Sequence, residues 1–315
     1  MNSKSKQPVL IIIGPTAVGK TDLSIRLAGL IDGEIISADS RLLYKGMDIG
    51  TAKPSREQLE KIKHHLVDIA EPLDTWSLAK YNEHVKKAIE EIHSRGRLPV
   101  LVGGTGQYVR SLLEGWDIPE VAPNMAMRIV LENWGKEIGP LELHKKLQMI
   151  DPRAAGMNDP DNLRRTVRAL EVMFLTGYRF SDQRLKAAPL HYYKVIGLNR
   201  PRNELYQRVD DRIESMFVDG FVQEVEDLLS KGIPLEAHSL SAIGYSEVIR
   251  YFQGLISLEE AKALMRKKTR NFIRKQANWF KPDDPCIEWF HMEPDPIDGI
   301  RSSVANWLSK RQSCD

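Results

Sequence analysis

An eight-residue run near the start of the chain has the composition of a phosphate-binding loop. Gly14–Thr21 fits the pattern GxxxxGK[ST] and lies between an apolar strand expected at Val9–Ile13 and a helix expected at Thr21–Ile31. In that setting successive backbone N–H groups converge on an anion, Lys20 adds positive charge, and the Thr21 hydroxyl can bind Mg²⁺. A glycine turn without a ligand is the alternative. We predict that a ligand with two or more phosphates is bound by Gly14, Pro15, Thr16, Ala17, Val18, Gly19, Lys20 and Thr21.

A carboxylate follows the next expected strand. Asp39 and Ser40 come directly after the apolar run Glu34–Ser37. The carboxyl ends of parallel strands meet at one edge of a sheet, so Asp39 is expected beside the phosphate-binding loop. A carboxylate there can hold a metal-bound water, cap a helix or act as a general base. Its position beside the loop favours a chemical role over capping alone.

A second glycine-rich loop follows the expected strand Leu98–Val102. In Gly103–Gly106 the glycines allow a ligand to approach the backbone closely, and Thr105 offers a hydroxyl at the same edge. A plain turn is the other interpretation. Neither later strand ends in an aspartate after four apolar residues, and no arginine finger has a recognisable context. The phosphate-binding loop lacks the residues for nucleotide hydrolysis, so it could hold the leaving group of a different transfer reaction.

Three arginines lie on a helix expected at Leu163–Thr176. Arg164, Arg165 and Arg168 flank its apolar stripe, so they are predicted to point outward at a spacing that suits successive phosphates. A solvated, salt-bridged face is the alternative. The apolar stripe consists of Leu163, Val167, Leu170 and Phe174.

Another basic element lies in the helix expected at Leu258–Phe280. The segment Lys262–Lys281 contains eight Lys or Arg residues and no acidic residue. At 100° per residue Lys267, Arg270, Arg274 and Lys281 share one side, with Ala261, Met265, Phe272 and Trp279 opposite. A line of cations without interleaved acids is typical of a surface that binds a nucleic-acid backbone.

The order of expected elements predicts an α/β fold, with a P-loop-type parallel sheet flanked by helices and an all-helical insertion. Further strands are expected at His65–Ile69 and Tyr193–Leu198, and a helix at Ser77–Ser94. Between about 117 and 190 no strand is expected, and helices are predicted at Met127–Trp134 and Pro140–Met149. Two further helices are expected at Arg202–Phe217 and Gly220–Ser230. The expected parts are a first core segment (1–116), the helical insertion (117–190), a return to the core (191–282) and a C-terminal tail (283–315).

Length and composition set the remaining limits. The chain has 315 residues, 42% of them hydrophobic, and a net charge of +2, so the basic helices are local features of a near-neutral protein. No apolar run approaches the roughly 20 residues that span a bilayer. Cys286 and Cys314 are too few for a disulfide framework or a zinc site. We expect a cytoplasmic protein without a membrane partner, acting as a monomer.

These motifs, in this order, resemble those of the tRNA dimethylallyltransferases. The resemblance runs from about residue 9 to residue 281, and the block Gly46–Pro54 (Gly-Met-Asp-Ile-Gly-Thr-Ala-Lys-Pro) is far more specific than the phosphate-binding loop. The motifs that carry it are Gly14–Thr21, Ile36–Ser40, Gly46–Pro54, His64–Asp68, Val102–Gly106, Arg164–Arg165, Arg168–Val172, Ala242–Tyr245, Thr269–Arg270, Gln276 and Trp279.

The resemblance implies transfer of the dimethylallyl group from dimethylallyl diphosphate to N6 of adenine at tRNA position 37. Asp39 would remove the proton from the adenine amine, Thr105 would help to position the acceptor or the bridging oxygen, and the loop with Mg²⁺ would hold the diphosphate. The adenine has to leave its stack to reach such a site. Leu42 stands where many members have Gln, and Ser241 and Ser246 stand where basic residues are common.

Contact with tRNA is expected at residues taken from the resemblance and from the basic helix. They are Asp39, Ser40, Arg41, Leu42, Thr105, Arg128, Arg164, Arg165, Thr166, Val167, Arg168, Ser241, Ala242, Ile243, Gly244, Tyr245, Ser246, Lys267, Arg270, Arg274, Lys275 and Gln276.

Three other functions share parts of this pattern. An adenylate isopentenyltransferase would use the same donor site on a free nucleotide, but the helical insertion and the basic helix argue against it. A small-molecule P-loop kinase could bind an acceptor hydroxyl at Asp39. A nucleotide-dependent RNA-binding protein would need no catalytic residues.

Overall fold

The computed structural model describes residues 6–116, 121, 123–183 and 188–312. Its contacts divide the chain into two compact units, one formed by 1–113 with 190–315 and the other by Glu114–Pro189. The second unit interrupts the first in the sequence, near the insertion expected at 117–190. Each unit has its own apolar core.

The first unit is built on a six-stranded sheet with the order β3-β2-β4-β1-β5-β6, and the pairings of neighbouring strands are all parallel. The strands β1, β2 and β4 are almost entirely buried, as expected for short apolar runs covered on both faces. Their bounds are β1 Pro8–Ile13, β2 Gly33–Ser37, β3 His64–His65, β4 Leu98–Gly103, β5 Tyr192–Asn199 and β6 Ile287–His291.

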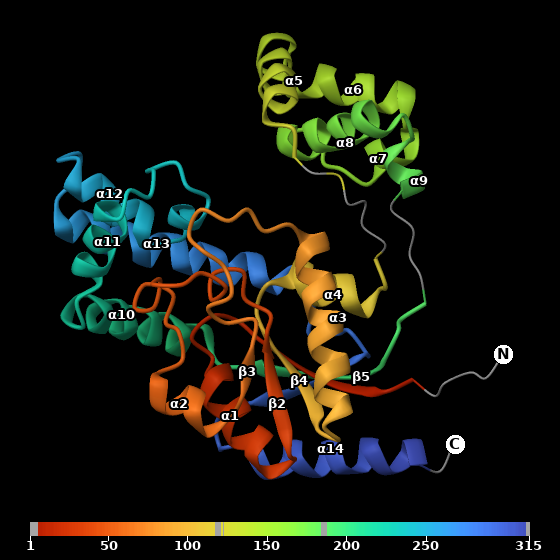
Figure 1. Cartoon of the computed structure of the whole chain (residues 1–315), viewed down its shortest axis with the longest axis vertical. Helices are drawn as coiled ribbons and strands as arrows, with labels where there is room; N and C mark the ends of the chain where they lie inside the picture. The colour runs from red at the N-terminus through yellow and green to blue at the C-terminus, as the bar shows by residue number, and fades with distance from the viewer. Residues whose placement is uncertain (1–5, 117–120, 122, 184–187, 313–315) are drawn as a thin grey trace. The chain divides into compact units, whose positions relative to one another are not determined.

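Helices cover both faces of this sheet (Figure 1). Helix α1 connects β1 to β2 and contacts α14, whereas α3 connects β2 to β4 and contacts α4. Right-handed crossovers that run in opposite directions place these two pairs on opposite faces. The helices of this unit are α1 Lys20–Leu30, α2 Arg56–Lys61, α3 Leu78–Ser94, α4 Gly106–Leu113, α10 Arg202–Val218, α11 Phe221–Ser230, α12 Tyr245–Phe252, α13 Leu258–Ala277 and α14 Ile297–Gln312, with a 3₁₀ turn at Ser239–Ser241.

Two expectations about the first unit differ from the structure. A strand was expected at His65–Ile69, but β3 consists of His64–His65 alone, because Leu66 and Asp68 adopt left-handed backbone conformations that end the extended chain. The described part of the segment expected as a tail, residues 283–312, forms elements of the first unit: β6 pairs with β5, and α14 buries Ile300 and Val304. Strand β6 was not predicted because it is short and only half-buried along most of its length.

The basic helix also differs from its prediction. Helix α13 ends at Ala277, so Lys281 lies beyond it, and Phe272 is 40% exposed instead of buried. The buried stripe runs through Ala261, Met265 and Ile273. It is displaced from the predicted stripe because α13 packs against both α10 and α12.

The second unit consists of five helices among the residues described for it. Its core is formed by α5, α6 and α8, which place Leu131, Leu143 and Leu170 inside. Phe174, predicted to be buried, is 55% exposed because the buried face of α8 turns toward Ala169 and Met173. The helix bounds are α5 Met125–Ile138, α6 Pro140–Ile150, α7 Pro152–Gly156, α8 Leu163–Thr176 and α9 Phe180–Gln183.

Within the described residues of both units, no helix is long and apolar enough to cross a membrane.

Candidate active site

The phosphate-binding loop connects β1 to α1 in a tightly constrained conformation. A Cβ atom on Gly14 would lie 2.7 Å from the Leu198 carbonyl oxygen, so only glycine fits there. Gly19 has φ of 109°, and Ala17 has φ of 67°, which is unusual for a residue with a side chain. This backbone turns at the carboxyl end of β1, and Lys20 begins α1.

Two arginines missed in the sequence fix this loop from outside. The Arg208 Nε donates to the Ala17 carbonyl at 2.7 Å, and the Arg200 Nε donates to the Val18 carbonyl at 3.1 Å. Arg200 follows β5 and Arg208 belongs to α10, so both come from segments remote in sequence. Because these arginines engage the carbonyls, they hold the strained turn at Ala17 in place.

Lys20 is folded onto its own loop. Its ammonium donates to the carbonyls of Gly14 at 2.9 Å and Pro15 at 2.8 Å. Burial lowers the pKa of Lys20 to about 8, with Asp39 acting in the opposite direction and Arg212 in the same direction. Arg212, on α10, is a further cation that the sequence analysis missed. The Thr21 side chain is exposed at the N-terminus of α1.

Asp39 and Thr105 lie close together at the ends of β2 and β4, which are neighbours in the sheet. The Thr105 hydroxyl accepts from the Ser40 N–H at 3.4 Å, and the Thr105 N–H donates to the Ala38 carbonyl at 3.2 Å. A Cβ atom on Gly103 would lie 2.2 Å from the Ala38 carbonyl oxygen, so this glycine permits the close approach of the two loops. The predicted pair is therefore brought together beside the phosphate-binding loop.

Two arginines, Arg41 and Arg212, interact electrostatically with Asp39. The Asp39 Oδ1 accepts from the Arg41 N–H at 2.9 Å. The guanidinium of Arg41 donates to the His238 carbonyl at 3.0 Å and to the Ser241 Oγ at 3.2 Å. Burial lowers the pKa of Arg212, Arg208 reinforces the shift, and the Asp39 charge opposes it. A half-buried carboxylate with cations nearby suits an acceptor site next to an anion.

The block Gly46–Pro54, the most specific motif in the sequence, is anchored by one carboxylate. Glu224 on α11 accepts from the N–H groups of Asp48, Ile49 and Gly50, at 2.8, 2.7 and 3.1 Å, and from the Tyr245 hydroxyl at 2.6 Å. A Cβ atom on Gly50 would lie 2.1 Å from the Phe221 ring. The glycine and the carboxylate explain why this loop has so restricted a sequence.

The segment Ser241–Ser246 lies mostly inside the protein. Ala242 and Tyr245 are buried, and burial raises the pKa of the Tyr245 phenol well above its usual range. Ser241 is exposed, and the Ser246 hydroxyl donates to Glu247 at 2.9 Å. Leu42 is half-buried, and its carbonyl accepts from the Asp68 N–H at 3.1 Å. Ile243 is half-buried and Gly244 is buried, so little more than Ser241 is left as an exposed side chain here.

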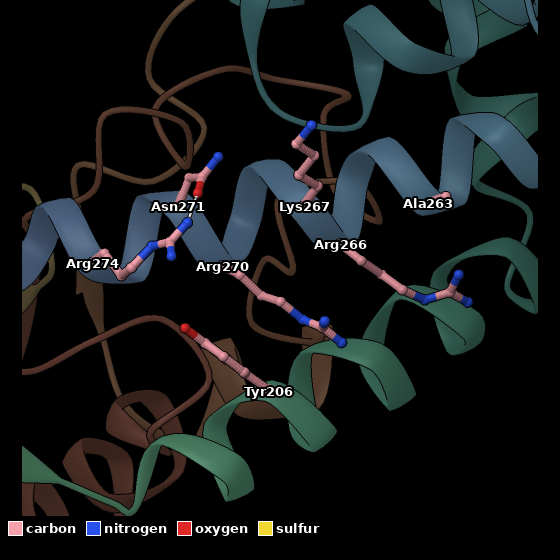
Figure 2. A pocket seen from close by; sticks show the side chains of 7 residues that line it. All are labelled: Tyr206, Ala263, Arg266, Lys267, Arg270, Asn271 and Arg274. Carbon is pink, nitrogen blue, oxygen red and sulfur yellow. Dashed lines mark hydrogen bonds between the residues drawn. The ribbon is translucent and has the colours of Figure 1, made fainter.

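Helix α13 does not carry an unpaired row of cations, because acidic partners come from neighbouring helices. Arg270 pairs with Asp210 and Arg266 with Glu214, both on α10. A groove of about 510 Å³ lies along this side of α13. Figure 2 shows Arg266 and Arg270 directed toward α10 and Lys267 directed away from it.

The remaining predicted residues of α13 divide into two groups. Lys267, Arg274 and Lys275 are exposed. Gln276 is buried, with 6% of its surface exposed, and contacts the phosphate-binding loop. It therefore faces the interior, although the sequence analysis expected it to contact tRNA.

In the second unit the buried Glu171 pairs with two of the arginines that were predicted to contact tRNA. The carboxylate of Glu171 accepts from Arg128 at 2.9 Å, from Arg168 at 2.7 Å and from the Asn124 N–H at 2.8 Å. Burial opposes ionisation of Glu171, but these donors lower its pKa. Arg168 is thus paired within the unit and only partly exposed, whereas it was predicted to point outward. Arg164 and Arg165 are exposed, whereas Thr166 and Val167 are buried.

The described residues contain no cluster of three or more His, Cys, Asp or Glu side chains that could hold a metal ion. Mg²⁺ commonly keeps several waters and binds proteins through one or two ligands together with substrate phosphates. The exposed Thr21 hydroxyl beside Lys20 fits that mode, so a metal brought in with a diphosphate suits this site.

The sheet, the loop after β1 and the carboxylate after β2 define a P-loop α/β protein, in which a candidate acceptor site lies next to a candidate phosphate site. Residues 42–283 match the sequence profile of the family described as IPP transferase. The chain belongs to that family.

Relatives match along almost the whole chain. The tRNA dimethylallyltransferase of Thermomicrobium roseum is 43% identical over 96% of this chain and 92% of its own length. That of Bacillus pumilus is 42% identical over 92% of both.

Two solved structures also match almost the whole length of this chain. The tRNA isopentenylpyrophosphate transferase of Bacillus halodurans has a TM-score of 0.73 at 37% identity and covers 98% of this chain and 99% of its own. A eukaryotic dimethylallyltransferase, in a structure described as acting on tRNA, has a TM-score of 0.79 at 25% identity, over 97% of this chain and 80% of its own.

Proposed function

We propose that this protein transfers the dimethylallyl group from dimethylallyl diphosphate to N6 of adenine at position 37 of tRNA. The observation that carries the proposal is the meeting of a phosphate-binding loop with the Asp39–Thr105 pair at adjacent strand ends. Membership of the IPP transferase family, and relatives named tRNA dimethylallyltransferases, support this interpretation of the site.

At the donor end, the loop amides and Lys20 bind the diphosphate. Arg212 adds positive charge on the side of Asp39. Mg²⁺, held by the Thr21 hydroxyl and the diphosphate oxygens, would neutralise charge on the departing group. Fixed positive charge accelerates the reaction because negative charge grows on the bridging oxygen as the carbon–oxygen bond breaks.

At the acceptor end, the adenine N6 attacks the first carbon of the prenyl group. A carbon–nitrogen bond forms while the carbon–oxygen bond breaks, and diphosphate leaves with the bonding electron pair. Asp39 accepts the proton that N6 loses, and Thr105 positions the acceptor beside it. Diphosphate and prenylated tRNA are the products, so no oxidant or further reactant is needed.

The RNA contacts come from exposed cations in each unit. Arg164 and Arg165 are exposed on α8, and Lys267, Arg274 and Lys275 are exposed on α13. Cations of this kind bind phosphates without reading sequence. The working form is inferred to be a cytoplasmic monomer, and sedimentation with and without tRNA tests the monomeric state.

The test is transfer of labelled dimethylallyl from its diphosphate, in the presence of Mg²⁺, to unmodified tRNA, to a tRNA with guanine at position 37, or to AMP. Label is expected only in the unmodified tRNA. Label in AMP would instead identify an adenylate isopentenyltransferase. Absence of label from all three acceptors would refute prenyl transfer and leave the kinase or the RNA-binding function.

The role of Asp39 is tested in the same assay. Asp39→Asn keeps an oxygen that can accept from the Arg41 N–H but removes the base, so turnover is expected to fall roughly 10²- to 10⁴-fold with tRNA affinity changed far less. Asp219→Asn, at an exposed helix end, is the matched control. Full activity in Asp39→Asn would exclude it as the base.

A further inference from the structure

Gln276 connects two loops that are far apart in the sequence. It lies in the last turn of α13, and its Oε1 accepts from the Thr16 N–H at 2.8 Å and from the Thr16 hydroxyl at 3.2 Å. Its Nε2 donates to the Gly104 carbonyl at 3.1 Å. Thr16 belongs to the phosphate-binding loop, and Gly104 immediately precedes Thr105. One side-chain amide therefore holds the donor loop to the acceptor loop.

The end of α13 packs closely against two glycines of the acceptor loop, Gly104 and Gly106. A Cβ atom on Gly104 would lie 2.2 Å from the Gln276 Nε2 and 3.2 Å from the Gly14 carbonyl oxygen. A Cβ atom on Gly106 would lie 2.0 Å from the Trp279 ring, three residues beyond Gln276. The two glycines thus allow the end of α13 to sit against the acceptor loop.

A third contact fastens the chain just beyond the glutamine. Arg110 on α4 donates to the Trp279 carbonyl at 2.9 Å and to Asp284 at 3.2 Å. The chain is therefore held at Trp279 as well as at Gln276, which restrains the side-chain amide between the two loops. A rigid element that binds both loops fixes the distance between them.

That distance matters for the transfer. The attacking nitrogen, the prenyl carbon and the departing oxygen have to be aligned, and a misplacement of about 1 Å can cost roughly 10²-fold in rate. The diphosphate is held by the loop after β1, whereas the acceptor is placed by the loops after β2 and β4. Alignment of the reacting atoms thus depends on how these loops are spaced.

We propose that Gln276 is a positioning residue for the transfer. It touches neither reactant, and it sets the donor loop against the acceptor loop through Thr16 and Gly104. This inference rests on the proposed function. Gln276 was expected to contact RNA, and in this proposal it instead links the two loops inside the protein.

The test compares Gln276→Leu and Gln276→Glu with the same substitutions at Gln253, an exposed glutamine that follows α12. In single turnover at saturating tRNA and donor, Gln276→Leu is expected to react at least tenfold more slowly. Its affinity for tRNA is expected to change less than twofold. Its affinity for pyrophosphate with Mg²⁺, measured by calorimetry, is expected to fall at least threefold because the donor loop loses its anchor.

Gln276→Glu provides a pH signature. A protonated carboxyl retains one acceptor for Thr16 and one donor for Gly104, whereas the ionised form has no donor. The rate of Gln276→Glu relative to the unsubstituted protein at each pH is therefore expected to rise as pH is lowered. This ratio cancels titrations common to both proteins, and it decides the role even if Gln276→Leu does not fold.

Two results would overturn the inference. One is a loss of tRNA affinity in Gln276→Leu with full single-turnover rate, which would make Gln276 an RNA contact. The other is a flat pH ratio in Gln276→Glu, accompanied by unchanged pyrophosphate affinity in Gln276→Leu where that variant folds. An unsubstituted protein that transfers no prenyl group would refute the proposed function alone, and the pyrophosphate affinities would still decide the role of Gln276.

Discussion

At the scale of single residues, the site depends on where each charged or polar group finds its partners. Lys20 and Asp39 take the positions that their motifs indicate. Arg212 and Glu224 were missed because nothing in their local sequence distinguishes them from other helix-surface charges. Their importance arises only when α10 and α11 pack beside the loops after β1 and β2. A charged residue that follows ordinary helix spacing gives no signal of this kind.

The lowered pKa of Lys20 leads to a prediction about pH. Its ordinary pKa is 10.5 and its folded value is about 8, so the free protein loses this positive charge as pH rises through about 8. Pyrophosphate affinity is expected to fall above that pH. Binding there should take up a proton, because the anion favours the ammonium form.

Calorimetry in two buffers of different ionisation enthalpy measures that proton uptake. Lys20→Met is the reference, and it should bind weakly at all pH values without a change near pH 8. Identical proton uptake in the two proteins would show that Lys20 does not titrate there.

At the scale of elements, periodicity predicted most helices and the buried strands, but it placed side chains less well. Phe174 and Phe272 fit an apolar stripe and are nevertheless exposed, because the packing of neighbouring helices rotates the buried face. Strand β6 and the short strand β3 lack the long apolar run that makes β1 and β4 easy to identify. Helix bounds, set by local caps, were predicted within a few residues; α8 matched its expected range.

Arg165, which is exposed on α8, and Arg168, which pairs with Glu171, should respond differently to substitution. Arg165→Ala removes an exposed cation and is expected to weaken tRNA binding with unchanged thermal stability. The slope of log affinity against log salt should become shallower by about 0.7–0.9 for each phosphate that the protein no longer neutralises. Arg168→Ala removes one partner of the buried Glu171 and is expected to lower the free energy of unfolding by about 1–3 kcal/mol, as is usual when a buried group loses a partner.

Binding titrations over a range of salt concentrations and thermal unfolding of both variants separate the two roles. Equal stability of both variants would contradict the assignment of Arg168.

A buried charge cluster stabilises the edge of the sheet. The Glu34 carboxylate on β2 accepts from Arg95 at 2.8 Å and lies 2.7 Å from the His65 Nε2. Burial opposes ionisation, but these partners lower the pKa of Glu34 to about 2 from an ordinary 4.5. A carboxyl with a depressed folded pKa stabilises the protein above pH 4.5, and this contribution is lost as pH falls toward 2.

Glu34→Gln is therefore expected to lower the free energy of unfolding by about 3 kcal/mol at pH 7, and by much less near pH 3. Denaturant titrations at the two pH values give the comparison. Glu60→Gln, which removes an exposed ion pair with Arg56, should change stability by less than about 1 kcal/mol at either pH. An equal loss at pH 7 and pH 3 would show that Glu34 acts through packing and not through its charge.

At the scale of the whole molecule, the net charge is near zero, and exposed cations lie on particular helices, α8 and α13 among them. Much of the charge on α13 is neutralised by α10, which the sequence could not indicate because the acidic partners lie about 50 residues or more upstream. Lys267 and Arg274 remain exposed at the surface. Replacing both with Ala is expected to raise the KM for tRNA and reduce the salt slope by roughly one to two, with kcat nearly unchanged.

Steady-state kinetics at several salt concentrations measure this effect. The matched control replaces Arg56 and Lys61 on α2, which removes the same charge from cations paired within their own helix. A salt slope that is the same in both double variants would remove this surface of α13 from the RNA interface.

The contacts of Lys20 with the carbonyls of Gly14 and Pro15 have a consequence for selectivity. An incoming anion must draw the ammonium away from two oxygens that already satisfy it. We expect a monophosphate or sulfate, which presents its oxygens on a single centre, to compete less well than a diphosphate, whose two phosphoryl groups can each replace one of these contacts. The loop is therefore expected to favour diphosphates over the abundant small anions of a cell, whatever organic group the diphosphate carries.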